Sequence, residues 1–233
     1  MADNKHGREG NSADRWRLIL LLDACEAANL CPIPLMRMHA LAFLANVLAP
    51  VWSTQSYDGK ILKRRGGPFY PELQAQLDRL VGLGFVLISN VSHTEENGQW
   101  TLAGSFGLNE ELTRPVLALA EKFAEERLTR EFFRRLAYAT SRLTKPLESV
   151  IEFDATWSDN RTGEGDVVDF AEWRRANYSA FTANFFERLT DTGSQKTAGD
   201  RLQMYMFLLD RKGADSLKIG GENGAPRAIA RSN

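Results

Sequence analysis

The sequence predicts a mainly α-helical protein with a small β-hairpin, an α+β fold, and two observations carry this prediction. The first is a leucine repeat at helical spacing behind Pro71, a residue that suits the first turn of a helix because its missing N–H costs nothing there. The second is Asn97-Gly98, a strong hairpin signal between two short apolar segments. The repeating leucines are Leu73, Leu77 and Leu80.

The N-terminal half contains the parts of a winged helix-turn-helix in their usual order. The expected elements are two helices, a basic loop, a third helix and two strands, at 15–30, 34–48, 52–69, 70–82, 85–91 and 99–106. The second helix is apolar almost all round, so we expect it to be largely buried. His39 lies on that helix and is expected to be a hydrogen-bonded core or interface residue. These elements predict a winged-helix-like domain over residues 15–108.

The C-terminal half, residues 109–212, predicts a helical domain. A helix is expected from Thr113, and alternation of apolar with polar residues predicts a short strand over 149–157. An aromatic-rich helix is expected over 169–190, before a last helix that contains the apolar run Met204–Leu209. That run implies burial on several sides, and we expect a partner or a self-interface to cover part of it. The segments predicted to be disordered tails are 1–14 and 213–233.

The composition is that of a soluble protein without a dominant charge. The chain has 233 residues and a net charge of −1, so no whole-protein field attracts DNA or an anionic membrane. Cys25 and Cys31 lie in apolar surroundings and are expected to be free thiols rather than a disulfide. The longest apolar run, Leu18 to Leu22, is far too short to span a bilayer. We therefore expect a cytoplasmic protein without a membrane segment.

No motif in the sequence predicts catalysis or a cofactor. It has no phosphate-binding glycine loop that ends in Lys-Ser/Thr, and no G-x-S-x-G motif. A group of acids could be imagined as a magnesium site, but their spacing matches no calcium loop, and surface acids in a loop are the preferred interpretation. These acids are Glu152, Asp154, Asp159, Glu164, Asp166 and Asp169. We expect neither a metal nor an enzyme.

The candidate functional residues lie in the basic loop before the third helix. They are Lys60, Lys63, Arg64 and Arg65. Cations clustered beside a recognition helix can neutralise DNA phosphates, and they can equally pair with acids of a protein partner. A third interpretation is that they are only solvated, and all three alternatives are open. The helix itself carries Glu72 and Asp78, which would repel phosphate, so sequence-specific DNA reading is the weaker of the DNA hypotheses.

Two segments carry a resemblance to a known family. They are DACEAANLCPIPLMRMHALAFLANVLAPVW at 23–52 and DGKILKRRGGPFYPELQAQLDRLVGLGFV at 58–86. Both resemble the small middle component of bacterial ABC three-component systems, of which the Lamassu-type anti-phage defence systems are the best known. The resemblance covers about residues 15–106 and implies a non-enzymatic accessory subunit. The implied partners are an SMC-like ABC ATPase, an effector expected to be a nuclease, and double-stranded DNA, with no membrane and no small-molecule substrate.

Three hypotheses follow. The first is this accessory subunit, which links an ATPase, DNA and an effector. The second is a stand-alone winged-helix transcriptional regulator, which would bind its own promoter as a symmetric dimer. The third is a metal-dependent nuclease built on the acidic loop.

Overall fold

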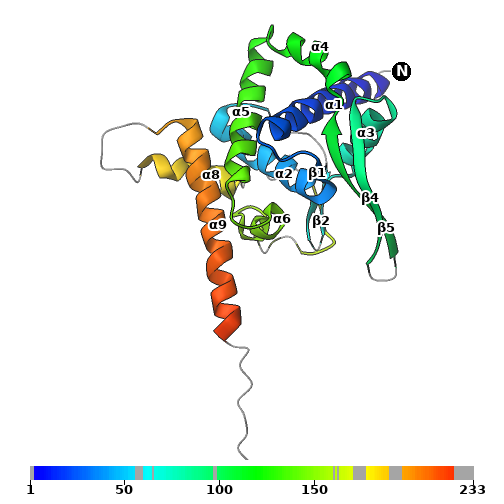
Figure 1. Cartoon of the computed structure of the whole chain (residues 1–233). Coiled ribbons are helices and arrows are strands. Elements are labelled where there is room, and N and C mark those ends of the chain that lie inside the picture. Colours follow the sequence, from blue (N-terminus) through cyan, green and yellow to red (C-terminus); the bar gives the residue numbers. More distant parts are fainter. Residues whose placement is uncertain are drawn as a thin grey trace, which may run out of the picture.

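The structure gathers its helices and two small antiparallel sheets around helix α2 (Figure 1). The computed structural model describes residues 3–55, 60–64, 66–96, 99–159, 161, 163–169, 177–188 and 196–222. The helices are α1 (Asp3–Ala27), α2 (Leu35–Trp52), α3 (Pro71–Gly82), α4 (Glu110–Ala120), α5 (Ala124–Ser141), α6 (Leu147–Val150), η1 (Ile151–Phe153), α8 (Tyr178–Phe185), η2 (Phe186–Arg188) and α9 (Ala198–Glu222). The strands are β1 (Ile33–Pro34), β2 (Lys60–Arg64), β3 (Gly67–Phe69), β4 (Val86–Glu96), β5 (Gln99–Leu108) and β6 (Val167–Asp169). The predicted mainly α, α+β fold is confirmed.

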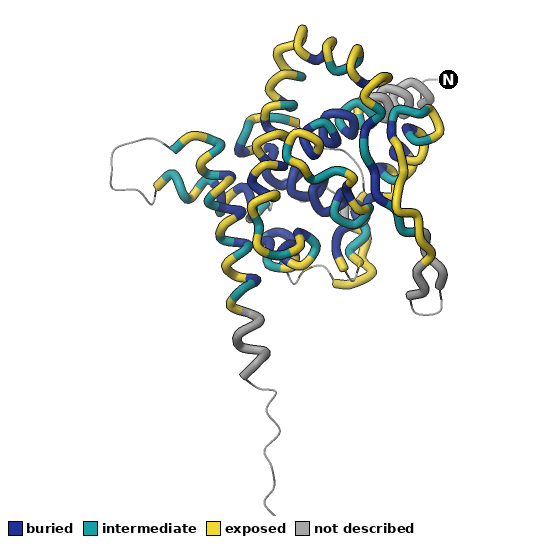
Figure 2. Tube along the Cα trace, in the orientation of Figure 1, coloured by how far each residue is buried: buried dark blue, intermediate teal, exposed yellow. Residues whose placement is uncertain are grey.

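Helix α2 forms the centre of the core. Its side chains from Met38 to Ala49 are buried on every face, as its uniform apolarity predicts (Figure 2). It is 18 residues long and apolar enough to cross a membrane by length and composition, but 72% of it is buried inside the protein, which is typical of the core helix of a soluble protein. The buried cluster around it runs from Leu18 to Leu209, so both halves of the chain contribute to one core.

The first sheet has the connectivity expected of a winged helix. Its strand order is β1-β5-β4, with Ile33 opposite Phe106 and Ile88 opposite the same residue on the other side. Helix α3 precedes β4 and buries its three repeating leucines, while Val81 is half-buried. The hairpin predicted between 85–91 and 99–106 is confirmed, and its turn at 97–98 lies outside the described residues.

The basic segment is a hairpin rather than the predicted loop. Strands β2 and β3 pair from Leu62–Phe69 to Arg64–Gly67, and β6 pairs with the other edge of β2. Gly66 and Gly67 have φ of 92° and 128°, which glycine adopts without strain, and this allows the tight return of the chain. Buried Ile61 fixes one face of β2 inward. The prediction of a loop was wrong because the double glycine acts as a turn between two paired strands.

The strand predicted over 149–157 is absent, because this segment forms α6, η1 and a turn. Leu147, Val150 and Ile151 are buried at a spacing of three and four residues, which is a helical pattern. Asp154, which follows this helical stretch, is also buried. The sequence prediction counted Asp154 as a polar residue on the solvent face of a strand, and this is why the prediction was wrong.

Other boundaries in the C-terminal half also differ from the predictions. The helix expected from Thr113 begins at Glu110, and the chain breaks at 121–123 before α5. The long helix expected over 169–190 is α8 followed by η2, while Val167–Asp169 is strand β6. Residues 170–176 and 189–190 of that prediction lie outside the described residues.

The predicted disordered tails are helical over much of their length. Helix α1 begins at Asp3, and no proline interrupts its sequence. Helix α9 runs on to Glu222, and its Gly213 is buried against η1 and α6. Residues 1–2 and 223–233 of these two predictions lie outside the described residues.

His39 lies in the core, as predicted. Its hydrogen bonds join α2 to α3. Its Nδ1 accepts a hydrogen bond from the Tyr70 N–H at 3.3 Å, so Nε2–H donates to Gln74 Oε1 at 3.1 Å. The imidazole has no exposed surface. Burial lowers the pKa of His39 from 6.5 to about 4, and the hydrogen bond to Gln74 opposes this only in part. The neutral ring is therefore the form that holds the two helices together.

This histidine predicts a loss of stability in weak acid. The unfolded chain binds a proton at His39 near pH 6.5 and the folded protein near pH 4, so the free energy of unfolding falls as pH decreases between these values. Over this pH interval the free energy of unfolding falls by about 3 kcal/mol. Urea unfolding at pH 7 and pH 4.5 measures it, with His39→Gln as the control that cannot titrate. An equal pH dependence in both proteins would contradict the assignment.

Candidate functional site

The four predicted cations do not share one free surface. Lys60 is exposed on β2, and exposed Arg64 places its guanidinium 4.5 Å from the centre of the Phe69 ring. Lys63 points the other way, because side chains alternate along a strand and Ile61 faces inward. Arg65 lies outside the described residues. The structure therefore exposes Lys60 and Arg64 on one side of β2 and turns Lys63 toward the protein.

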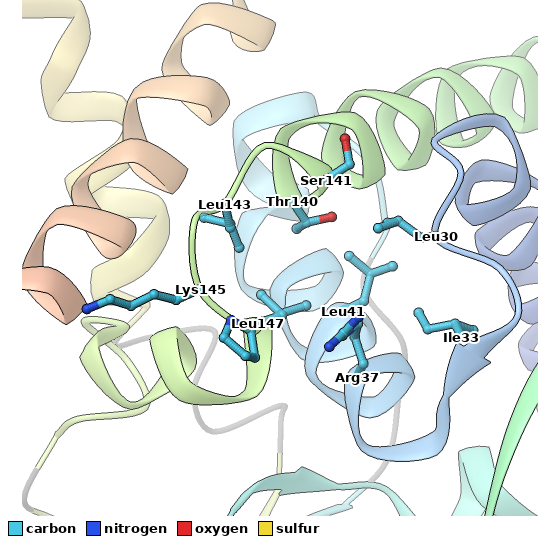
Figure 3. A pocket seen from close by; sticks show the side chains of 10 residues that line it. Leu30, Ile33, Arg37, Leu41, Thr140, Ser141, Leu143, Lys145 and Leu147 are labelled. Atoms are coloured by element: carbon cyan, nitrogen blue, oxygen red, sulfur yellow. The ribbon is translucent and has the colours of Figure 1, made fainter.

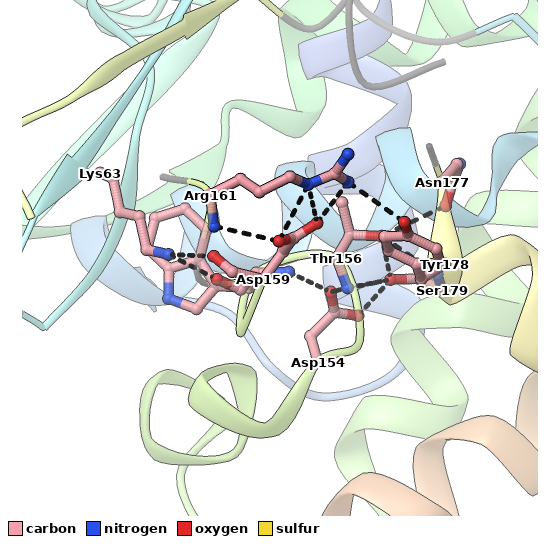
Figure 4. A network of polar contacts seen from close by, with 9 residues as sticks. Lys63, Asp154, Thr156, Asp159, Arg161, Asn177, Tyr178 and Ser179 are labelled. Carbon is pink, nitrogen blue, oxygen red and sulfur yellow. Dashed lines mark hydrogen bonds and ion pairs between the residues drawn. The ribbon is translucent and has the colours of Figure 1, made fainter. Parts of the chain in front are cut away.

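Lys63 joins the basic hairpin to the segment after η1 (Figure 4). Its Nζ donates to the carbonyl oxygens of Trp157 at 2.7 Å and Asp159 at 3.4 Å. The ammonium group also lies 5.3 Å from the centre of the Trp157 ring. Burial lowers the pKa of Lys63, against the opposing charges of Asp159 and Asp166. Lys63 has a structural role here, and period-two alternation in the sequence KILKR was the signal that could have shown it.

Asp154 is the centre of a buried polar network (Figure 4). One carboxylate oxygen accepts the N–H groups of Thr156 and Trp157, both at 2.9 Å. The other accepts the hydroxyl of Tyr205 at 2.7 Å, and the Ser179 hydroxyl lies within 2.9 Å of both oxygens. Burial raises the pKa of Asp154, although each of these hydrogen bonds opposes that effect. The network ties the turn at 154–157 to α8 and α9.

Asp159 and Asp166 of the same segment also have partners within the protein. Asp159 pairs with Arg161, and Asp166 accepts the Gly163 N–H at 2.7 Å. Hydrogen bonds from Arg161 hold the pKa of Asp159 below its ordinary value. Within the described part of the chain, no group of three or more His, Cys, Asp or Glu side chains could hold a metal ion. Asp154, Asp159 and Asp166 thus use their carboxylates for contacts within the protein.

Helix α3 occupies the position of a recognition helix but presents acids to solvent. Glu72 and Asp78 are exposed, and Arg79 is the cation near them. Gln74 is engaged with His39 and donates to Asp78 at 2.7 Å. Two carboxylates on this face would repel phosphate, so the helix is poorly suited to lie in a DNA groove.

Exposed apolar side chains lie at the end of α3, on β4 and on α4. We define the wing patch as Leu83, Leu87, Val91 and Leu112, with exposed fractions of 56%, 55%, 52% and 43%. Ile88 is 40% exposed and faces the opposite side of β4 from Leu87. Strand β4 is at the edge of its sheet, since β5 pairs with only one of its sides. Exposed apolar groups on an edge strand are typical of surfaces that bind another protein.

A small cavity of about 250 Å³ lies between α2 and the end of α5 (Figure 3). Leucines 30, 41, 143 and 147 form much of its wall. The two cations at this cavity have partners: Arg37 pairs with Glu148 at 3.2 Å, and Lys145 donates to the carbonyl of Gly213. The cavity is below the usual size of a ligand pocket. Cys25 and Cys31 are free thiols, as predicted.

Comparison of this chain with protein-family models, curated proteins and solved structures found no match. The resemblance of segments 23–52 and 58–86 to an accessory component therefore stays a prediction. The evidence for function comes from the placement of charge and apolar surface described above.

We expect Lys63→Ala to destabilise the protein by about 1–2 kcal/mol, because it leaves two carbonyl oxygens without their charged donor. Lys60→Ala, on the same strand but exposed, is the matched control and should change little. Thermal or urea unfolding measures the difference. Equal stability of the two variants would show that Lys63 does not join the hairpin to residues 157–159.

We expect Asp154→Ala to cost at least about 3 kcal/mol, because it removes the acceptor of the Tyr205 hydroxyl and of the Trp157 N–H in a buried site. Glu152→Ala removes an exposed carboxylate two residues away and is the control. Urea unfolding measures the loss. If Asp154→Ala folds as stably as the wild type but a metal-dependent nuclease activity disappears, the nuclease hypothesis would gain over the structural role.

Proposed function

We propose that this chain is a protein-binding accessory subunit of an SMC-like ABC ATPase complex in bacterial anti-phage defence. In this proposal it is cytoplasmic, has no catalytic activity, and links the ATPase to an effector nuclease. The observation that carries the proposal is the wing patch, where exposed leucine and valine side chains offer no hydrogen-bond donor or positive charge to a phosphate. An apolar, edge-strand surface fits a protein partner and not a phosphate backbone.

The charges around the wing patch support a protein partner. Glu72 and Asp78 on α3 disfavour a nucleic acid and would favour basic side chains at the edge of a protein interface. Lys63 is engaged inside the protein. A winged-helix regulator that reads its own promoter would require a recognition helix without these acids, so the regulator is the weaker alternative.

DNA contact has a secondary place in this proposal. Lys60 and Arg64 leave a small cationic surface on β2. Two cations can contribute sequence-independent phosphate contacts, which weaken as salt increases. Lys60 and Arg64 could therefore strengthen DNA binding by a larger complex. The chain alone would bind DNA weakly.

The test is co-expression of the tagged chain with the genes encoded beside it, followed by purification and mass determination. We expect the ATPase to co-purify, and Leu83→Glu with Leu87→Glu to weaken this binding at least about tenfold, because two exposed anchors of the interface become charged. Phe181→Glu with Phe185→Glu is the matched control, since both side chains are exposed but lie on α8, which packs against α2 and α9.

The wild type and its variants test different parts of the proposal. Failure of any ATPase to co-purify would contradict the proposed function. Equal loss of binding in the control variant would place the interface elsewhere than the wing patch. Lys60→Glu with Arg64→Glu should leave complex formation intact and lower DNA retention by the complex.

A further inference from the structure

Helix α9 has one flank in the core and an unusual opposite flank. Its inward residues, Leu202, Tyr205, Met206 and Leu209, are buried. Its outward stripe, which we define as Asp200, Met204, Phe207 and Arg211, follows a spacing of four, three and four residues, so these side chains lie along one line of the helix. Figure 1 shows α9 at the edge of the protein, away from β4 and β5.

The middle of this stripe is apolar and open. Phe207 is 66% exposed, which is unusual for a phenylalanine on a helix whose other flank is fully covered. A groove of about 600 Å³ runs beside it, between α9 and the end of α5, with Phe186, Leu143 and Leu208 in its walls. The stripe thus offers an apolar ridge next to an apolar groove.

The ends of the stripe carry opposite charges. Asp200 is held in the first turn by a capping box, in which its Oδ2 accepts the Thr197 N–H at 3.0 Å and the Thr197 hydroxyl at 2.7 Å. Both hydrogen bonds engage Oδ2. Arg211, at the other end, is exposed and forms no ion pair with another described residue. Along α9 the stripe therefore has a negative charge at its N-terminal end, two apolar side chains in the middle and a positive charge at its C-terminal end.

We propose that this stripe is the contact between two copies of the chain, paired with their α9 helices antiparallel. Reversal of one helix brings Asp200 opposite Arg211 and Met204 opposite Phe207, and the two-fold axis repeats both pairs. Lys196, two residues before α9, and Asp215 carry opposite charges just beyond the two ends of the stripe, so they favour the same antiparallel arrangement. A parallel pair would instead place Asp200 against Asp200 and Arg211 against Arg211, which is repulsive.

The charge pattern selects a second copy over other occupants. The stripe is complementary to its own reverse at every position, and an unrelated helix would need the same order of charges by coincidence. From Asp200 to Arg211 it covers about 17 Å of helix at 1.5 Å per residue, which is a small contact. We therefore expect a dimer that dissociates in the micromolar range. This inference does not rest on the ATPase partner, since the chain alone is tested.

Sedimentation velocity of the full chain from about 1 to 100 μM measures the dimer. We expect Phe207→Glu to weaken it at least about tenfold. Phe123→Glu is the control, because Phe123 is 60% exposed but precedes α5 and lies off the stripe. A wild type that stays monomeric throughout, or a Phe207→Glu variant that dimerises as the wild type does, would overturn the proposal.

A charge exchange between two variants tests the antiparallel register. Arg211→Asp alone places acids opposite Asp200, and Asp200→Lys alone places lysines opposite Arg211, so each variant should be monomeric. In the mixed dimer the unchanged Asp200 of one chain faces the unchanged Arg211 of the other, and the two introduced charges, which are of opposite sign, also face each other, so the mixture should dimerise. Because Asp200→Lys also removes the capping box, Lys196→Asp mixed with Asp215→Lys repeats the test without it. Dimerisation of neither mixture would overturn the register.

Discussion

The burial of α2 is the constraint on which the rest of the structure depends. This helix has no polar face, so it gains stability only if other elements cover it all round. The covering elements come from the whole chain: β3 and β5 from the winged-helix half, and α5, α6, α8 and α9 from the helical half. The two halves therefore share one core, although their sequence patterns differ. The polar groups that this arrangement encloses, at His39 and Asp154, are hydrogen-bonded on each side, as a buried polar group requires.

The sequence allowed those elements to be predicted whose signal is local. Helix α3 begins at Pro71 and buries leucines at helical spacing, and β4 and β5 flank the Asn97-Gly98 signal, so both were found close to their observed bounds. The prediction of a strand over 149–157 was wrong because Asp154 is a buried polar residue. Its burial depends on hydroxyls of Ser179 and Tyr205, which are 25 and 51 residues away. No local pattern reveals such partners.

The sequence predicted which residues make up the candidate site, but not the directions in which their side chains point. Four cations in six positions indicated one basic surface, but β2 directs neighbouring side chains to opposite faces, so Lys63 became a structural residue while Lys60 and Arg64 stayed exposed. Pairing of β2 with β6 decides this, and β6 lies about a hundred residues further along the chain. The wing patch was missed for the opposite reason. Apolar residues on a strand are expected to be buried, and only the packing of the whole chain, which covers less than half of each side chain, leaves Leu87 and Val91 exposed.

The two proposed contacts are compatible with each other. The stripe on α9 uses the flank opposite to the one that covers α2, so pairing of two α9 helices leaves the core unchanged. The wing patch lies on β4, on the other side of the protein in Figure 1, so one chain can make both contacts at once. A dimer would then carry two wing patches, and an ATPase partner that offers two equivalent sites would bind it far more tightly than it binds one chain, because the second contact becomes intramolecular. Weak pairing through α9 would in that case be an advantage, since the dimer forms fully only where the partner brings two chains together.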